Sequence, residues 1–355
     1  MRRMSYIKMV AMVGIVAAAI AFGSIAWFTQ SREVEGSGVQ MRADDLPFDI
    51  ATKGTNIRNS SLIAAERPEY ETGESRTITE NNENVVYYTA DSLRLMFTPE
   101  TDNPKTEANE SIPPDIAPGS SGELSLYVIP KTNDSLNVKV SLNVAAFAEI
   151  DNVNNSGQKK VIEIKDAADF AAKAYAVGNT VEAAKATDYV NAAKYLRGHI
   201  LFFGAEGDTT NQTESSRYYY TTPYTTRIIK QPITAGNEGK AVKVPVYWMW
   251  TNTLGQIALP DNISSKRNGY PILNDSNTGD KAKIKTYLIS NKEEIFANSG
   301  SNTETYINAV TATVTAENFN NTAFTELSTG YNQADYLIGT KIAYILIEVT
   351  VEEDS

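Results

Sequence analysis

Alternation of apolar and polar residues dominates most of the chain. The clearest case is residues 136–144, LNVKVSLNV, in which every second side chain is apolar. This pattern predicts a strand with one face on a core and the other in water. Residues 123–129 predict a second strand, which Pro130 ends. With the polar segment 131–134 between them, we expect the two strands to form a β-hairpin.

Three further stretches predict strands, at residues 92–98, 241–250 and 341–352. In the last stretch both faces are largely apolar, because Tyr344 and Leu346 alternate with the apolar positions that start at Ala343. We expect a central strand covered on both sides, as is common in a β-sandwich. Pro245 in the second stretch indicates an edge position or a bulge, since proline donates no backbone hydrogen bond.

Helical patterns are confined to two places between the predicted strands. The first, residues 165–197, is rich in alanine and has a break at Gly178. Asp166 is expected to cap its first part, and Asn179 with Glu182 forms a capping-box pattern for its second part.

The second helical segment covers residues 280–297. Asp280 is its expected cap, and Ser290 with Glu293 forms a further capping-box pattern. Both segments are interpreted as insertions, so the sequence predicts a β-rich fold, an antiparallel β-sandwich with two helical insertions.

The N-terminal segment differs from the rest of the chain. MRRMSYIK is positively charged, and the uncharged run at residues 9–28 is, at roughly 20 residues, about long enough to span a bilayer. Its Ala and Gly content makes insertion less favourable, and Ser24-Ile25-Ala26 fits the small-x-small pattern before a signal-peptidase cut. We favour cleavage between Ala26 and Trp27, giving a secreted, extracellular or cell-surface protein; the alternative is a single-pass anchor retained to residue 28, with an exterior domain. The expected divisions are a signal peptide at 1–26, an extended N-terminal segment at 27–56 and a β-sandwich domain at 57–355.

Composition argues against one class of partner and bears on the compartment. The 355 residues carry a formal net charge of −11, with no cysteine and one histidine. Because no basic stripe offsets this acidic balance, nucleic acid is not expected as a partner. An exported chain without cysteine favours a Gram-positive surface over compartments where disulfides are common.

His199 is the candidate for catalysis. A zincin-type protease needs two histidines one helical turn apart, and a thiolate substitute needs cysteine, so the chain cannot build such a site. A Ser-His-Asp triad would have to use His199, but no Gly-x-Ser-x-Gly motif accompanies it. Carboxylate pairs for glycoside hydrolysis leave no signature in sequence. We therefore expect a structural histidine and a protein that is not an enzyme.

Calcium is the best cofactor candidate. Asn152, Asn154, Ser156 and Glu163, together with Gly157, fall at ligand positions of an EF-hand-like loop. The first ligand is Asn rather than Asp, and a good entering helix is absent. A polar hairpin loop without a metal is therefore the favoured interpretation, and no cofactor is expected.

Aromatic residues gather in two short stretches. RYYYTTPY, with Tyr218, Tyr219, Tyr220 and Tyr224, could form a stacking platform for sugar rings or a subunit interface. In YWMW, residues 247–250, alternation puts the tyrosine and methionine on one face and both tryptophans on the other. Core packing is expected for one of those two faces.

The segment AWFTQSREVEGSGVQMRA resembles the start of the TasA and camelysin-type exported proteins of Gram-positive bacteria. It follows their Ala-aromatic-Phe-(Thr/Asn/Ser) pattern at Ala26, Trp27, Phe28 and Thr29, and more loosely at Val34, Gly38 and Val39. DIAPGSSGELSLYVIP and PVYWMWTNTLGQI are similar to uncharacterised clostridial relatives with the same leader. The resemblance implies a dedicated signal peptidase and a jelly-roll-like β-sandwich. As in the biofilm-matrix members, it also implies polymerisation into fibres.

These observations predict a structural protein of the cell surface or extracellular matrix. After cleavage, Trp27, Phe28, Val34 and Val39 would anchor an extended segment that adds as a strand to a neighbouring copy. One heterologous contact repeated head to tail gives a filament. The expected partners are the chain itself, the signal peptidase and surface or matrix components. The alternative is a membrane-anchored adhesin or glycan-binding module that uses the Tyr-rich loop.

Overall fold

The structure, a computed structural model, describes residues 33–36, 39–42, 46–53, 74–90, 93–99, 115–116, 118–155, 157–206, 220–258, 278–312 and 320–354. By its internal contacts the chain divides into a unit that ends at Phe48 and a unit from Asp49 to Ser355. In the first unit, β1 (Glu33–Gly36) and β2 (Val39–Arg42) pair antiparallel in a two-stranded sheet of their own.

A seven-stranded sheet forms one layer of the second unit, in the order β12-β11-β14-β8-β3-β5-β4. Alternation accounts for β14 in its centre, because Val244 and Val246 are buried opposite Leu126 and Leu124 of β8. The strands of this sheet are β3 (Phe48–Lys53), β4 (Glu74–Glu80), β5 (Glu83–Ala90), β8 (Ser121–Pro130), β11 (Ile200–Glu206), β12 (Tyr220–Pro223) and β14 (Val242–Trp250).

The second sheet has six strands, in the order β10-β9-β15-β6-β7, with β13 also paired to β9. Its strands pair antiparallel except for the parallel contact of β6 with β7. Val144 of β9 lies opposite Ile347 of β15, and both are buried. The strands are β6 (Leu93–Pro99), β7 (Asp115–Ile116), β9 (Leu136–Asn152), β10 (Gln158–Glu163), β13 (Ile228–Ile233) and β15 (Tyr344–Glu353).

The expectation of a central C-terminal strand is confirmed. β15 pairs with β9 on one edge and with β6 on the other. Ile347 on one face and Leu346 on the other are both buried. The chain is thus β-rich with antiparallel sheets, as the alternation predicts.

The predicted hairpin of residues 123–129 with 136–144 is wrong, because β8 and β9 belong to different sheets. Along its first half, β9 already pairs with β13 on one edge and β15 on the other, so no edge remains for β8. The connection from β8 to β9 crosses between sheets, and the turn before β14 hydrogen-bonds to it. Gly239 N donates to Pro130 O at 2.8 Å, and Gly236 N donates to Asn133 O at 3.0 Å.

Pro245 occupies a locally unpaired edge, as expected. It lies opposite Ser125 of β8, while β11 pairs with β14 only from Tyr247 to Trp250. On the side of β11, the Tyr224 hydroxyl donates to Pro245 O at 3.4 Å. The missing N–H therefore faces a position where the pairing with β11 has ended.

Helices are more extensive than the sequence pattern predicts. The two expected helical regions are present, but α5, α9 and α10 were not expected. The helices are α3 (Ala167–Ala176), α4 (Ala183–His199), α5 (Leu254–Ala258), α7 (Thr278–Ser290), α8 (Lys292–Ile295), α9 (Thr303–Thr311) and α10 (Asn321–Lys341). In α10, many Thr, Asn, Gln and Gly residues obscure a buried stripe at Phe324, Leu327, Tyr331, Ala334 and Ile338.

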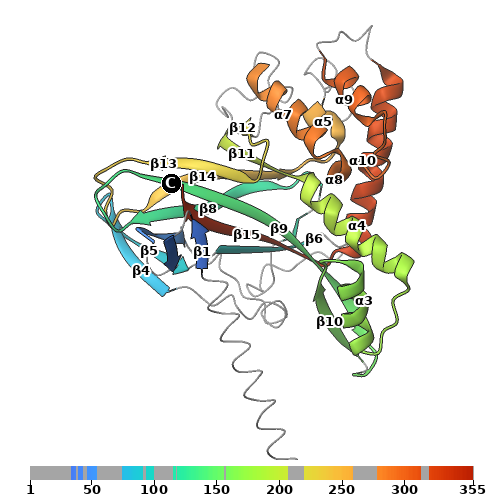
Figure 1. Cartoon of the computed structure of the whole chain (residues 1–355), viewed down its shortest axis with the longest axis horizontal. Helices are drawn as coiled ribbons and strands as arrows, with labels where there is room; N and C mark the ends of the chain where they lie inside the picture. Colours follow the sequence, from blue (N-terminus) through green and yellow to red (C-terminus); the bar gives the residue numbers. More distant parts are fainter. Residues whose placement is uncertain are drawn as a thin grey trace, which may run out of the picture. The chain divides into compact units, whose positions relative to one another are not determined.

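A helical core covers one end of the seven-stranded sheet. Leu201 and Phe203 of β11 and Met249 of β14 belong to one buried cluster with residues of α5, α7, α9 and α10. Figure 1 shows these helices together with α8 at one end of the sheets. Elsewhere α3 contacts β10, and α4 contacts both β9 and α10. This arrangement makes α4 and α10 the connection between the helices and the sheets.

One of the predicted helix caps is confirmed. Asp166 Oδ1 accepts from Asp169 N at 2.8 Å at the start of α3. The Asn179 and Glu182 capping box is wrong, because α4 begins after Glu182 without a side-chain cap and Asn179 Nδ2 donates to Asp151 O at 3.2 Å. A tertiary partner thus replaces the local one.

The other two expected caps also bind elsewhere. Asp280 lies inside α7 and accepts from Thr222 N at 2.8 Å, which joins α7 to β12. Glu293 accepts from Ser299 Oγ at 3.0 Å, so the capping box with Ser290 is wrong. Asp280 thus binds a long-range donor, and Glu293 binds a donor in the loop that follows its helix.

Candidate functional site

His199 lies at the junction of the sheet and the helices and is fully buried. Its Nδ1 is 2.6 Å from Asp335 Oδ1, and its Nε2 is 2.9 Å from Ile295 O. The ring stacks on Tyr331 with 4.1 Å between centroids. Because a carbonyl oxygen can only accept, Nε2 is the donor to Ile295.

The network around His199 extends through further buried groups. Trp250 Nε1 donates to the same Asp335 oxygen at 2.9 Å. The Tyr331 hydroxyl lies 2.7 Å from Thr251 Oγ1 and 3.1 Å from Thr251 O. Burial raises the pKa of the Tyr331 hydroxyl well above its usual value. These bonds connect α10 to the end of β14.

Tyr287 of α7 bonds to the residue that precedes His199. Its hydroxyl donates to Gly198 O at 2.9 Å, and burial raises its pKa to about 12. Both ring nitrogens of His199 are occupied, and the one that would accept a proton in a triad donates to a backbone carbonyl. The histidine therefore joins α4, α8 and α10 and does not form a Ser-His-Asp triad.

The calcium candidate residues do not come together. Asn152 Oδ1 accepts from Asn155 N at 3.1 Å in the turn between β9 and β10, and Asn154 Nδ2 donates to Ala176 O at 3.2 Å. Glu163 is at the far end of β10, opposite Phe147, and is 5% exposed. Ser156 lies outside the described residues. Asn152 bonds within the turn, Asn154 bonds to α3, and Glu163 lies away from both, so the structure does not bring these candidates together. Within the described residues, no cluster of three or more His, Cys, Asp or Glu could hold a metal ion.

The residues expected to donate a strand are described in part. Ala26, Trp27 and Phe28 lie outside the described residues, as does the whole leader. Val34 is in β1 opposite Met41, and Val39 is in β2. Of the helices in the described ranges, none has the length and apolar character needed to cross a bilayer.

The Tyr-rich stretch is only partly described, and Tyr218 and Tyr219 lie outside. Tyr220 is buried and stacks on Tyr247 with 5.0 Å between centroids, so it is a core residue and does not form an exposed platform. Tyr224 is half-buried, and burial raises its pKa.

Alternation in residues 247–250 is as expected. Tyr247 and Met249 face the helical core, whereas Trp248 and Trp250 are buried on the opposite face. The indole N–H of Trp250 reaches Asp335 from that side. Both faces therefore serve packing.

One edge of the six-stranded sheet stands out. β6 pairs with β15 along Leu93 to Phe97, but on its outer edge it meets only β7, at Thr98 and Pro99, among the strands that the structure describes. No lysine or proline lies between Leu93 and Phe97 to discourage a further strand.

The other outer strands carry such features. β13 contains Pro232, and β12 ends at Pro223. β4 is mostly exposed and includes Glu74 and Arg76. β6 also contains Arg94 and ends at Pro99, but the stretch from Leu95 to Phe97 carries neither a charge nor a proline. We therefore take β6 as the candidate edge for strand addition.

The register shows which groups of β6 face outward. Phe147 O accepts from Ala343 N at 2.8 Å, so the backbone of Phe147 faces β15. The backbone N–H and C=O of its partner Tyr344 therefore point to β9, and those of the next residue, Ile345, point to β6. Following the alternation, Leu95 directs its backbone groups to β15, whereas Met96 directs its own to the outer edge.

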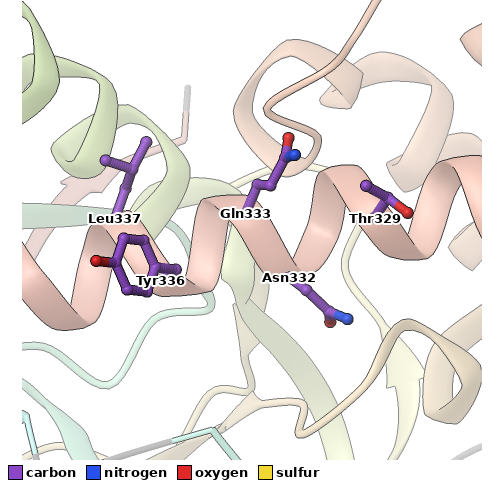
Figure 2. Close-up of a pocket in the computed structure, with 5 residues that line it drawn as sticks. All are labelled: Thr329, Asn332, Gln333, Tyr336 and Leu337. Carbon is purple, nitrogen blue, oxygen red and sulfur yellow. The ribbon is translucent and has the colours of Figure 1, made fainter.

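A second candidate site is a hollow of about 460 Å³ along α10. Among the described residues, it is lined by Thr329, Asn332, Gln333, Tyr336 and Leu337. Figure 2 shows that all five come from α10, with Tyr336 and Leu337 at one end and Thr329 at the other. Sequence reasoning missed this stripe because α10 itself was not expected, although its spacing follows the helical period.

Comparison of the chain with protein-family models, curated proteins and solved structures finds no match.

Proposed function

We propose that this protein is an exported structural component of a Gram-positive cell surface or extracellular matrix and that it assembles into filaments by strand addition. The observation that carries the proposal is the outer edge of β6, which has backbone donors and acceptors and no lysine or proline between Leu93 and Phe97. A strand added there would extend the sheet in which β15, the strand paired to the other edge of β6, is buried on both faces. On this proposal the two sheets form a jelly-roll-like sandwich.

The donor is the N-terminal segment from Trp27 to Val39, freed by cleavage after Ala26. Part of it pairs in the two-stranded sheet of β1 and β2. A two-stranded hairpin is at best marginally stable in water, so its pairing can be exchanged for a longer one. Trp27, Phe28 and Val34 would then provide the apolar anchors of the added strand.

Cleavage acts as the switch in this mechanism. Before it, the donor is continuous with the apolar leader and remains at the membrane. After it, the donor of one copy reaches the β6 edge of the next, so the contact joins two different segments of the chain. Such a heterologous contact repeats without closing, which produces an open filament.

A proline substitution at Met96 tests whether the outer edge of β6 accepts the added strand. Met96→Pro removes an N–H that faces outward and leaves the ladder with β15 intact, whereas Met96→Ala keeps the N–H. We expect fibres from the processed wild type and Met96→Ala in negative-stain electron microscopy, and single particles from Met96→Pro. Deletion of Trp27 to Val34 should also give single particles.

Thermal unfolding provides the control for folding. Met96→Pro and Met96→Ala should melt at similar temperatures, since both retain the pairing with β15. N-terminal sequencing of the exported protein should begin at Trp27. Fibres that persist in both the proline variant and the deletion would contradict the proposal, as would a processed wild type that stays monomeric.

A further inference from the structure

The hollow on α10 has the chemistry of a site for a neutral ligand. Its described lining contains amide, hydroxyl, aromatic and aliphatic groups but no charged side chain. The volume of about 460 Å³ falls within the range of roughly 300–1,000 Å³ that small-molecule sites occupy.

Tyr336 supplies an exposed aromatic ring in this hollow. It is 71% exposed, although folded proteins tend to cover rings of this size. Leu337 lies next to it and is partly buried, which gives the ring an apolar neighbour. A phenol ring with one face open can stack on a flat apolar surface of a ligand while its hydroxyl remains in water.

Asn332 and Gln333 supply the polar groups. Neither side chain makes a hydrogen bond with the described part of the protein, so both amides keep donors and acceptors for a ligand. Figure 2 shows them between Tyr336 and Thr329, projecting to opposite sides of the helix. Asn332 is one helical turn before Tyr336 on the same side of the helix, so a ligand lying along that side would meet an aromatic ring at one end and the Asn332 amide next to it.

We propose that this α10 groove binds a neutral oligosaccharide. Sugar hydroxyls both donate and accept, as amides do, and the C–H face of a pyranose ring is the flat apolar surface that Tyr336 can stack on. From Thr329 to Leu337 the helix rises by about 12 Å, which suits a short stretch of sugar chain. A charged ligand finds no counter-charge among the lining residues that the structure describes.

This site is independent of strand addition. The groove is on α10, whereas the acceptor edge is on β6, in the six-stranded sheet. A surface or matrix protein with such a groove would hold polysaccharide along its filaments. A protein that does not bind saccharide could still form filaments, and a protein that does not form filaments could still bind saccharide.

Titration of the full-length protein with chitotriose, cellotriose and maltotriose tests the proposal, with trigalacturonic acid as the acidic comparison. By isothermal titration calorimetry and saturation-transfer NMR, we expect saturable binding of at least one neutral trisaccharide. The acidic trisaccharide should bind more weakly. Tyr336→Ala should weaken the neutral ligand by about 10-fold or more, equivalent to about 1.4 kcal/mol.

Matched variants separate the groove from general surface effects. Tyr336→Phe keeps the ring and should retain most of the affinity, and Asn332→Ala should reduce it. Tyr175→Ala is the control, because Tyr175 is equally exposed at 75% but lies on α3 outside the groove. The proposal is overturned if no neutral trisaccharide binds, if Tyr336→Ala binds like the wild type, or if Tyr175→Ala loses binding to the same extent.

Discussion

His199 Nδ1 lies 2.6 Å from Asp335 Oδ1, and this contact joins the last residue of α4 to the middle of α10. Asp335 also accepts from Trp250 at the end of β14. One carboxylate oxygen therefore ties two helices and the seven-stranded sheet together. The pair is buried away from the α10 groove residues, which face outward on the same helix.

Asp335→Ala should strongly destabilise the protein. Leaving a buried polar group without its hydrogen-bond partner costs about 1–3 kcal/mol for each group. His199 and the Trp250 indole would both lose their acceptor. Denaturant unfolding monitored by tryptophan fluorescence measures the loss. Glu326→Ala is the control on the same helix, since Glu326 is exposed, and it should change stability little.

Gly198→Ala should destabilise through a backbone clash. A Cβ at Gly198 would lie 2.1 Å from Glu294 O, a backbone atom that cannot rotate away. Overpacking of this kind costs about 1–3 kcal/mol or more. Gly339→Ala is the matched control, because an added methyl group there would meet nothing within 4 Å and Ala favours a helix by about 1 kcal/mol. Equal melting temperatures for the two variants would contradict the close contact of α4 with α8.

Alkaline pH should unfold the protein through its buried tyrosines. The Tyr287 pKa is raised by burial from 10.0 to about 12, so between these values the unfolded chain loses a proton that the folded chain keeps. Stability is therefore complete below pH 10 and falls as pH rises, by about 1.4 kcal/mol per pH unit for each such tyrosine.

Tyr287→Phe isolates this contribution. The variant loses the hydrogen bond to Gly198 O and should be less stable at neutral pH. Its stability should nevertheless decline less steeply than that of the wild type above pH 10, which urea unfolding at several pH values can measure. An unchanged slope would show that Tyr287 ionises alike in both states.

Thr222 is a site where substitution should stabilise the protein. Its φ of 56° is in the left-handed region, which a β-branched side chain disfavours. Thr222→Asn keeps the N–H that donates to Asp280, and Asn tolerates this conformation, so a gain of about 1 kcal/mol is expected. Thr222→Val remains β-branched and should give no gain. Differential scanning calorimetry of the two variants makes the comparison.

The candidate sites were accessible from the sequence to different degrees. β6 could be located from its alternation, but its open edge depends on which strands lie beside it. His199 could be identified as structural from the lack of catalytic partners, whereas Asp335 and Trp250 are distant in sequence and gave no signal. The groove on α10 depends on a helix whose polar composition concealed its periodicity.

Local periodicity determined the strands of this protein, and long-range packing decided how they are used. The alternation in β9, β14 and β15 fixes which side chains share a face, because successive side chains of a strand point to opposite sides. Alternation contains no information about which strand lies next to which. From the sequence alone we therefore predicted that β8 pairs with β9. In the structure both edges of β9 are occupied by other strands, and β8 belongs to the other sheet. For a similar reason Asn179 donates to Asp151 O, while Asp280 accepts from Thr222 N and Glu293 from Ser299 Oγ, since a polar group takes whichever partner the folded chain brings nearest.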